Sequence, residues 1–213
     1  MDSFIANHKP VVTLWAALAA GVIAFAAPAG AQDLTVPGAP QEAESHEGPT
    51  PIPDAQTRLR ELLDELQNPE SPDWKRAESD LQREWSRSGS PAMDLLLQRG
   101  QAALAAGDSA AAIEHLTALV DHAPGFAEGW NARATAYFTA GEFGPSLADI
   151  RQVLTLNPDH YGALAGLGLI LEQLDHPQAA AEAFRASLKA NPHQADVREQ
   201  LEKLEHSTEG TEL

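Results

Sequence analysis

Apolar residues recur at helical spacing along most of the chain after Asp54. The first stretch places its leucines on one stripe, with acids and arginines on the opposite side: Leu59, Leu62, Leu63 and Leu66. After a proline-containing break, a second stripe follows at the same spacing: Trp74, Ala77, Leu81 and Trp85. Side chains three and four residues apart share one face of an α-helix, so both stretches predict amphipathic helices. We expect a pair of such helices over residues 55–91.

The pattern that follows repeats at a fixed interval. Pro124, Pro158 and Pro192 are spaced thirty-four residues apart, and three units in register cover residues 93–126, 127–160 and 161–194. Small residues and turn residues fall at matching places in the units: Gly100, Ala134 and Gly168, then Gly107, Gly141 and Asp175, then Ala112, Ser146 and Ala180. Each unit therefore predicts a helix, a tight turn, a second helix and a proline stop.

These units resemble the tetratricopeptide repeat family, whose pattern is W-x2-L-G-x2-Y, then A-x3-F, then P. The matching residues are Leu96, Arg99, Gly100, Ala103, Ala112, Leu116 and Pro124 in the first unit, Trp130, Arg133, Ala134, Tyr137, Ser146, Ile150 and Pro158 in the second, and Leu164, Leu167, Gly168, Leu171, Ala180, Phe184 and Pro192 in the third. The two arginines depart from the pattern. The resemblance implies an all-α fold, a right-handed superhelical stack of antiparallel helix pairs.

The small residues have a packing role in this interpretation. We expect the small residue of the first helix in each unit to face the small residue of the second, because larger side chains would push the helices apart. A stack of repeats also needs end pieces. We expect residues 55–91 to be a degenerate repeat before the three repeats of residues 92–194. Residues 195–206 should form a C-terminal capping helix, with Val197, Leu201 and Leu204 on its buried stripe, and residues 207–213 a flexible tail.

The N-terminal region reads as a targeting segment. Residues 1–31 hold an apolar run that ends in the small residues Ala29, Gly30 and Ala31, which resembles a secretory signal peptide cleaved after Ala31. This predicts a periplasmic or secreted protein. The alternative is an uncleaved helix that anchors the chain in the membrane, since the run is nearly long enough to span one. Residues 32–54 are rich in proline and predict a disordered linker.

Composition excludes several classes of partner and chemistry. The 213 residues carry 31 acidic and 14 basic side chains, a formal net charge of −17, which disfavours nucleic acid and anionic lipid surfaces. The chain has no cysteine, so disulfides, thiolate catalysis and lipoprotein anchoring through cysteine are excluded. A membrane contact is expected only if the N-terminal segment is not cleaved.

The sequence contains no specific catalytic or cofactor motif. The chain has eight histidines, but His115 and His122 have no close ligand partners and no HExxH motif occurs. No G-x-S-x-G motif and no glycine-rich phosphate loop is present. We therefore expect no catalytic residue, no metal site, no cofactor and no enzymatic activity. A hydrolase or lyase site hidden among the many carboxylates is the remaining enzyme hypothesis.

A binding surface is the main functional expectation. In a superhelix of helix pairs, the first helix of each unit lines a concave groove. The positions opposite the buried seam are Asp94, Leu97, Gln101 and Leu104 in the first unit, Glu128, Asn131, Thr135 and Phe138 in the second, and Gly162, Ala165, Leu169 and Glu172 in the third. Phe138 either anchors a partner in this groove or closes the core with Phe143. The sequence is compatible with both arrangements.

The groove residues indicate what kind of partner would bind. Some members of the family grip a terminal carboxylate with lysine, asparagine and arginine side chains, but the matching positions here hold Leu97, Gln101, Ala132, Gly162 and Gly166. An acidic, partly apolar groove favours a basic or apolar protein segment instead. The leading hypothesis is a protein-binding module of the bacterial cell envelope. The alternative is an assembly factor for cell-wall and division coordination or cytochrome maturation, acting mainly through its N-terminal helices. Oligomeric state is left open.

Overall fold

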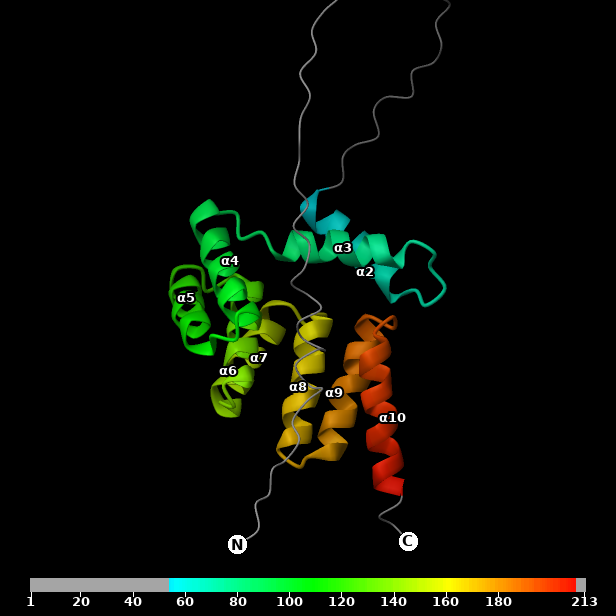
Figure 1. Ribbon diagram of the computed structural model, residues 1–213. Helices are drawn as coiled ribbons and strands as arrows, with labels where there is room; N and C mark the ends of the chain where they lie inside the picture. The colour runs from blue at the N-terminus through cyan, green and yellow to red at the C-terminus, as the bar shows by residue number, and fades with distance from the viewer. Residues whose placement is uncertain (1–53, 210–213) are drawn as a thin grey trace, which may run out of the picture.

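The computed structural model describes residues 54–209 of the chain, and every regular element in that range is an α-helix (Figure 1). The helices are joined by short links and lie mostly antiparallel to their neighbours. They are α2 (Ala55–Gln67), α3 (Trp74–Trp85), α4 (Pro91–Ala105), α5 (Ser109–His122), α6 (Ala127–Thr139), α7 (Phe143–Leu156), α8 (Tyr161–Gln173), α9 (Pro177–Ala190) and α10 (Ala195–Glu209). The all-α class and the helix-pair units predicted from the pattern are confirmed.

The corners of the repeat fall at equivalent places. Each second helix of a unit ends in a single C-cap residue that is followed by proline: Pro124 after α5, Pro158 after α7 and Pro192 after α9. Within the units, the three aligned turn residues adopt positive φ angles: Gly107 at 77°, Gly141 at 79° and Asp175 at 61°. Glycine takes this conformation without strain and aspartate tolerates it. The thirty-four-residue register is therefore a structural register.

Close helix contact within a unit rests on glycines that face large side chains. A Cβ at Gly168 would lie 2.4 Å from the Phe184 ring, and one at Gly100 would lie 2.4 Å from Leu116. In the second unit the expected small-to-small contact does form, because Ser146 Oγ donates a 2.8 Å hydrogen bond to the Ala134 carbonyl. The expectation is thus corrected for the glycines. Gly100 makes room for Leu116 and Gly168 makes room for Phe184, and each of these large residues lies four positions after the small residue of the second helix.

Arg133, one of the two departures from the family pattern, is held inside the stack. Its Nε and Nη2 each donate a 2.8 Å hydrogen bond to the Asp149 carboxylate, and Nη1 donates a 3.3 Å bond to Thr117 Oγ1 on α5. The guanidinium also lies over the rings of Trp130 and Tyr137. The hydrogen bonds to Asp149 raise the pKa of Arg133 above its ordinary value. The ion pair lies within the second unit, at a position where the family pattern has an apolar residue, and the hydrogen bond to Thr117 ties this unit to the first.

Helices α2 and α3 do not extend the stack beside α4. They lie across one end of the repeat helices (Figure 1), and their apolar stripes pack against the third unit. The buried residues of this cluster are Leu66, Ala77, Leu81, Tyr161 and Ala190. This corrects the expected placement of residues 55–91 as a degenerate repeat at the N-terminal end. The physical reason is that α8 and the end of α9 offer Tyr161, Leu164 and Ala190 as apolar partners.

The C-terminal helix closes the other side of the third unit. Val197 and Leu204 are buried and Leu201 is half-buried against the residues of α8 and α9, as expected for a capping helix. The helix continues to Glu209, so residues 207–209 of the predicted flexible tail are helical, and the rest of that predicted segment lies outside the described residues. The predicted signal peptide (1–31) and nearly all of the predicted linker (32–54) lie outside the described residues. None of the helices described, α2 to α10, is long and apolar enough to cross a membrane.

Candidate binding site

The first helices of the units, α4, α6 and α8, place the predicted groove residues in three different environments. Leu97 and Leu169 are each only 3% exposed. Leu97 packs with Ala132 and Ala136 of α6, and Leu169 packs with the capping helix. The prediction that these two leucines contact a partner is therefore corrected: they are core residues, because neighbouring first helices approach each other closely enough to bury them.

Phe138 also packs within the protein. Its ring centroid lies 5.7 Å from that of Phe143, and the side chain contacts the apolar clusters of the second and third units. It is half-buried. Of the two alternatives left open by the sequence, the structure favours closure of the core over an anchor for a partner.

Three further predicted positions, Asn131, Gly162 and Ala165, are buried by the neighbouring helices, so the prediction that they face a partner directly is corrected as well. The other predicted positions keep exposed surface. Gln101, Leu104, Glu128, Thr135 and Glu172 are all half-buried. The Thr135 hydroxyl donates to the Asn131 carbonyl on its own helix, so its oxygen can still accept a hydrogen bond. These side chains form a surface that is partly apolar and carries two carboxylates.

Helix α3 covers one end of this surface and turns it into a pocket. Gln82, Trp85 and Ser86 from the α3 region meet residues of α4, α6 and α8 around a partly open cavity of about 20 Å³. The lining residues from the repeats are Gln101, Glu128, Asn131, His160, Tyr161 and Gly162. Gln101, Glu128, Asn131 and Gly162 are among the positions predicted for the groove, whereas the contribution of α3 and of the aromatic residues His160 and Tyr161 was not predicted. The signal that could have indicated these two aromatic residues is their adjacency at the boundary between the second and third units.

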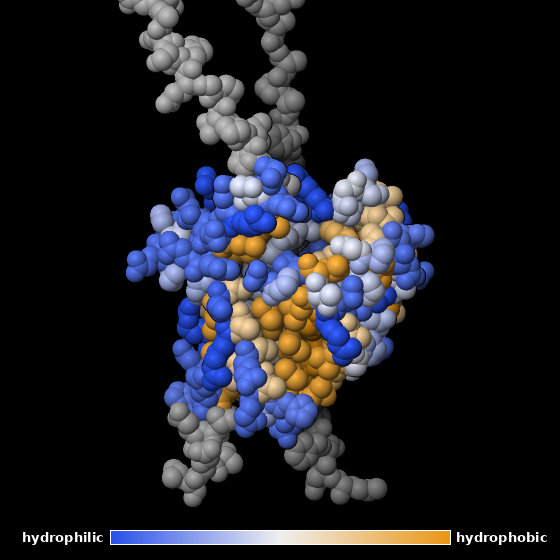
Figure 2. Space-filling model, turned by 180° about the vertical axis from the view of Figure 1, so that it is seen from behind, coloured by the Kyte–Doolittle hydropathy of each residue, from blue (hydrophilic) through white to orange (hydrophobic). Residues whose placement is uncertain are grey.

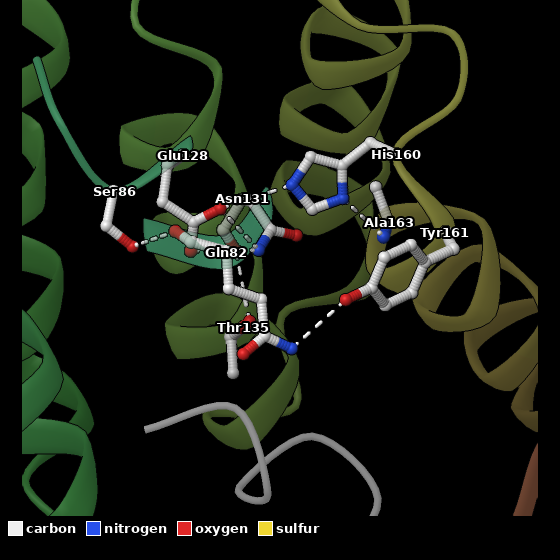
Figure 3. A network of polar contacts seen from close by, with 8 residues as sticks. All are labelled: Gln82, Ser86, Glu128, Asn131, Thr135, His160, Tyr161 and Ala163. Carbon is white, nitrogen blue, oxygen red and sulfur yellow. Dashed lines mark hydrogen bonds and ion pairs between the residues drawn. The ribbon is translucent and has the colours of Figure 1, made fainter. Parts of the chain in front are cut away.

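The side chains of the pocket form a connected polar network (Figure 3). The Ala163 backbone N–H donates to His160 Nδ1 at 3.2 Å, and His160 Nε2 lies 3.2 Å from a Glu128 carboxylate oxygen. Since Nδ1 accepts, the proton of a neutral His160 ring lies on Nε2 and faces Glu128. Trp85 stacks on the His160 ring with centroids 4.6 Å apart. His160 thus links the cap of α8, the acid of α6 and the aromatic ring of α3.

Tyr161 and Asn131 complete the network. Gln82 Nε2 donates a 3.0 Å hydrogen bond to the Tyr161 hydroxyl, and burial, helped by the charge of Glu78, raises the pKa of that phenol. Asn131 Nδ2 points at both oxygens of Glu128, at 3.4 Å each. Its other atom, Oδ1, is buried and has no hydrogen-bond partner among the described residues. An unsatisfied buried carbonyl is costly, so this acceptor is a notable feature of the pocket.

Glu172 lies at the other end of the candidate surface, near the capping helix. Burial raises the pKa of its carboxyl above the ordinary value of 4.5, and the nearby charge of Lys203 acts in the opposite direction. An acid with a raised folded-state pKa binds its proton more tightly in the folded chain than in the unfolded chain. The resulting stability is present below about pH 4.5 and is lost as the pH rises through the raised pKa.

We therefore expect Glu172→Gln to raise the melting temperature at neutral pH, because the neutral amide avoids the cost of a partly buried charge. The gain should shrink as the pH falls through the raised pKa and should be absent below the ordinary value of 4.5, where the carboxyl is protonated in both the folded and the unfolded chain. Thermal melts of both proteins across this pH range measure the effect. Glu182→Gln on the exposed side of α9 is the control and should leave the melting temperature unchanged at every pH. A gain that persists in acid would contradict this explanation.

An apolar area on the surface and the absence of a metal-binding cluster among the described residues both bear on what could bind here. Seen from behind, apolar residues gather in one area over the repeat helices, below the N-terminal helix pair, with hydrophilic residues around it (Figure 2). Within residues 54–209 no three histidine or acidic side chains come together in a group that could hold a metal ion. The described surface thus offers apolar and acidic contacts for a partner.

Comparison with known proteins agrees with the geometry. The sequence profile of the tetratricopeptide repeat matches residues 97–144 and 131–195. A TPR repeat-containing protein of Rhizobium etli is 32% identical over 154 residues, which make up 72% of this chain and 76% of that protein. The human DnaJ homolog subfamily C member 3 is 30% identical over 131 residues, or 61% of this chain but only 26% of that relative.

Solved structures show the same fold. The Sgt2 TPR domain of Aspergillus fumigatus matches 58% of this chain and 83% of that domain, with a TM-score of 0.55 and 24% identity. The first TPR domain of human RPAP3 matches 57% of this chain and 95% of that domain, with a TM-score of 0.54 and 21% identity. The repeat register, the helix pairs and these likenesses lead to one conclusion: the chain belongs to the tetratricopeptide repeat family.

Proposed function

We propose that the protein is a non-enzymatic module that binds a segment of another protein on the surface formed by α4, α6 and α8. The observation that carries this proposal is the set of half-buried side chains that remain on these helices: Gln101, Leu104, Glu128, Thr135 and Glu172. The repeat helices also carry an apolar area (Figure 2), and contiguous exposed apolar surface commonly marks interaction sites. The residues of this surface bring no nucleophile and base together.

The chemistry of the surface selects the partner. Glu128 and Glu172 place negative charge at its two ends, Leu104 is apolar, and the whole chain carries a formal charge of −17. Opposite charge on the partner would speed encounter and fix its orientation. The partner segment is therefore basic with apolar side chains. The Thr135 hydroxyl offers an acceptor to the backbone of such a segment.

The alternative function, an assembly role through free N-terminal helices, receives less support. Leu66 and Leu81, one residue from each of the two N-terminal stripes, are completely buried in the cluster that these stripes share with the third unit. A partner helix could reach these stripes only if α2 and α3 first left the third unit. The repeat surface is thus the better candidate for recognition.

A charge-reversal pair tests the binding surface. The full chain is immobilised in three forms: wild type, Glu172→Lys and Glu182→Lys. Each form is exposed to a bacterial extract, the proteins that it retains are identified, and their affinities for the three forms are measured. Glu172→Lys should weaken binding of a basic partner at least about tenfold, whereas the same change at exposed Glu182 on α9 should have little effect. Added salt should release the partner from wild type. Equal binding by all three proteins would reject the surface.

The location of the protein is a separate part of the proposal. We propose that the protein works in the bacterial cell envelope after export, on the strength of the N-terminal sequence up to Ala31. Expression of the full chain in a Gram-negative host, followed by fractionation and mass measurement, tests this. Export predicts a periplasmic protein that starts at Gln32. A full-length product in the membrane fraction would favour the uncleaved anchor instead.

A further inference from the structure

The pocket under α3 contains an acceptor that the described protein does not satisfy. Asn131 is 5% exposed, and its Oδ1 has no hydrogen-bond partner among residues 54–209. The amide cannot be improved by exchanging its oxygen and nitrogen, because Oδ1 would then face the Glu128 carboxylate, which Nδ2 now approaches at 3.4 Å. Figure 3 shows Oδ1 on the side of the amide away from Glu128, beside His160 and Tyr161. The missing partner must therefore be a hydrogen-bond donor.

The charge around this acceptor is negative. Glu128 contributes a carboxylate to the lining, and Glu78 lies close enough to Tyr161 to influence its pKa. None of the nine residues lining the cavity is lysine or arginine. Trp85 and Tyr161 add aromatic rings, whose faces attract cations. A donor that carries positive charge fits this environment better than a neutral one, and an anion does not fit it.

The size of the cavity narrows the choice. It measures about 20 Å³, which is enough for one group the size of water. A primary ammonium has that size and donates three hydrogen bonds, whereas a planar guanidinium and a trimethylated ammonium are larger. The cavity is partly open, so a chain could carry such a group in from outside.

We propose that this pocket binds the primary ammonium group of a lysine side chain from the partner. The inference rests on the proposed function and identifies the basic residue that the surface recognises. The ammonium donates to Asn131 Oδ1 and to the Glu128 carboxylate, while the methylene chain of the lysine passes the ring of Trp85. Helix α3 is then part of the binding site, and it does not have to move away from the repeats for the lysine to bind.

The position of α3 is built into the fold, as this role requires. Trp85 stacks on His160 and Gln82 bonds to Tyr161, both at the start of α8. At the other end of the same helix, Trp74 stacks on His193 with ring centroids 4.4 Å apart. Contacts at both ends of α3 hold it over the pocket in the absence of any partner.

The test uses small probes on the full chain and needs no knowledge of the partner. Nα-acetyl-lysine methylamide is titrated while nuclear magnetic resonance follows the Asn131 side-chain amide and the Trp85 indole N–H. Nα-acetyl-norleucine methylamide, which has the same chain without the ammonium, and the Nε-trimethyl-lysine analogue are the matched probes. The lysine probe alone should produce saturating shifts at both groups, and the other two should bind at least about tenfold more weakly.

Two variants locate the binding. Glu128→Gln should weaken the lysine probe about tenfold or more, whereas Glu182→Gln on α9 should have no effect. Equal shifts with the lysine and norleucine probes, or no saturation with any probe, would overturn the proposal and leave the cavity as a site for water. The probe comparison in wild type stands even if Glu128→Gln is unstable. Failure here leaves the Glu172→Lys experiment untouched, so the two proposals can fail separately.

Discussion

Replacing Asp149 by alanine should lower the free energy of unfolding by about 3–5 kcal/mol. Asp149 is 4% exposed and accepts two hydrogen bonds from Arg133, whose side chain is 13% exposed. The substitution leaves the guanidinium buried between the rings of Trp130 and Tyr137 without its counter-charge. Desolvation of an unpaired charge dominates the cost, because the net value of a buried ion pair is small while removal of one partner is severe. Urea denaturation monitored by circular dichroism measures the loss.

The third unit supplies the control for this prediction. In the third unit, the positions equivalent to Arg133 and Asp149 are occupied by Leu167 and Ala183, an apolar pair. The double variant Arg133→Leu with Asp149→Ala copies that pair, and it should recover most of the stability lost in Asp149→Ala. A double variant as unstable as Asp149→Ala would show that the ion pair itself, and not the unpaired charge, carries the effect. Glu114→Ala on the exposed face of α5 should change stability by less than about 0.5 kcal/mol.

Gly168→Ala is expected to cost about 1–3 kcal/mol, although alanine is the better helix former. The added Cβ would lie 2.4 Å from a ring carbon of Phe184, which is completely buried and cannot move away freely. Gly144→Ala in α7 is the matched control, because a Cβ there meets nothing within 4 Å. That variant should be neutral or slightly more stable than wild type. Thermal and urea unfolding of the two variants separate crowding from helix propensity.

A second substitution should rescue Gly168→Ala. In the second unit, Ala134 packs in one cluster with Ile150, which stands where Phe184 stands in the third unit. Adding Phe184→Ile to Gly168→Ala copies this pair, so the double variant should unfold at a higher urea concentration than Gly168→Ala. If Phe184→Ile instead adds its own loss to that of Gly168→Ala, the close approach of the two residues is not what limits stability at this site.

The repeat fold could be predicted because its signals are local and occur three times. Pro124, Pro158 and Pro192 each stop a helix through their own covalent geometry, and Gly107, Gly141 and Asp175 each supply the left-handed turn. Such constraints act within a few residues and survive any tertiary arrangement. The capping helix was predictable for a similar reason, since its stripe of Val197, Leu201 and Leu204 requires a neighbour on one side only.

The position of α2 and α3 could not be read from the same kind of pattern. An amphipathic stripe shows which face of a helix is buried, but it does not show against which partner. Here the partner lies about one hundred residues away along the chain, as in the hydrogen bond between Asn191 and Glu78. The pocket depends on that long-range contact, because Trp85 and Gln82 reach it only from the docked α3. This is why the sequence indicated Glu128 and Asn131 without indicating the site that they share.

The burial of individual groove residues was the second feature that the sequence pattern did not predict. Periodicity places Leu97 and Leu169 on the same face as Gln101 and Glu172, yet two of these side chains are core and two are not. The difference arises from how closely α4, α6, α8 and α10 approach one another, which depends on the small residues between them. Ala132 and Ala136 allow Leu97 to be enclosed. Exposure along a concave face therefore follows from packing between units and not from position within a unit.

The docking of α3 on the third unit is the central claim, since the candidate site exists only in that arrangement. Nuclear Overhauser effects between the ring protons of Trp85 and those of His160 and Tyr161, measured on the full chain in solution, test it most directly. The ring centroids lie 4.6 Å and 5.5 Å apart, so strong cross-peaks are predicted for both pairs. Cross-peaks from Trp85 to residues of α4 and α5 only, with none to His160 or Tyr161, would contradict the account.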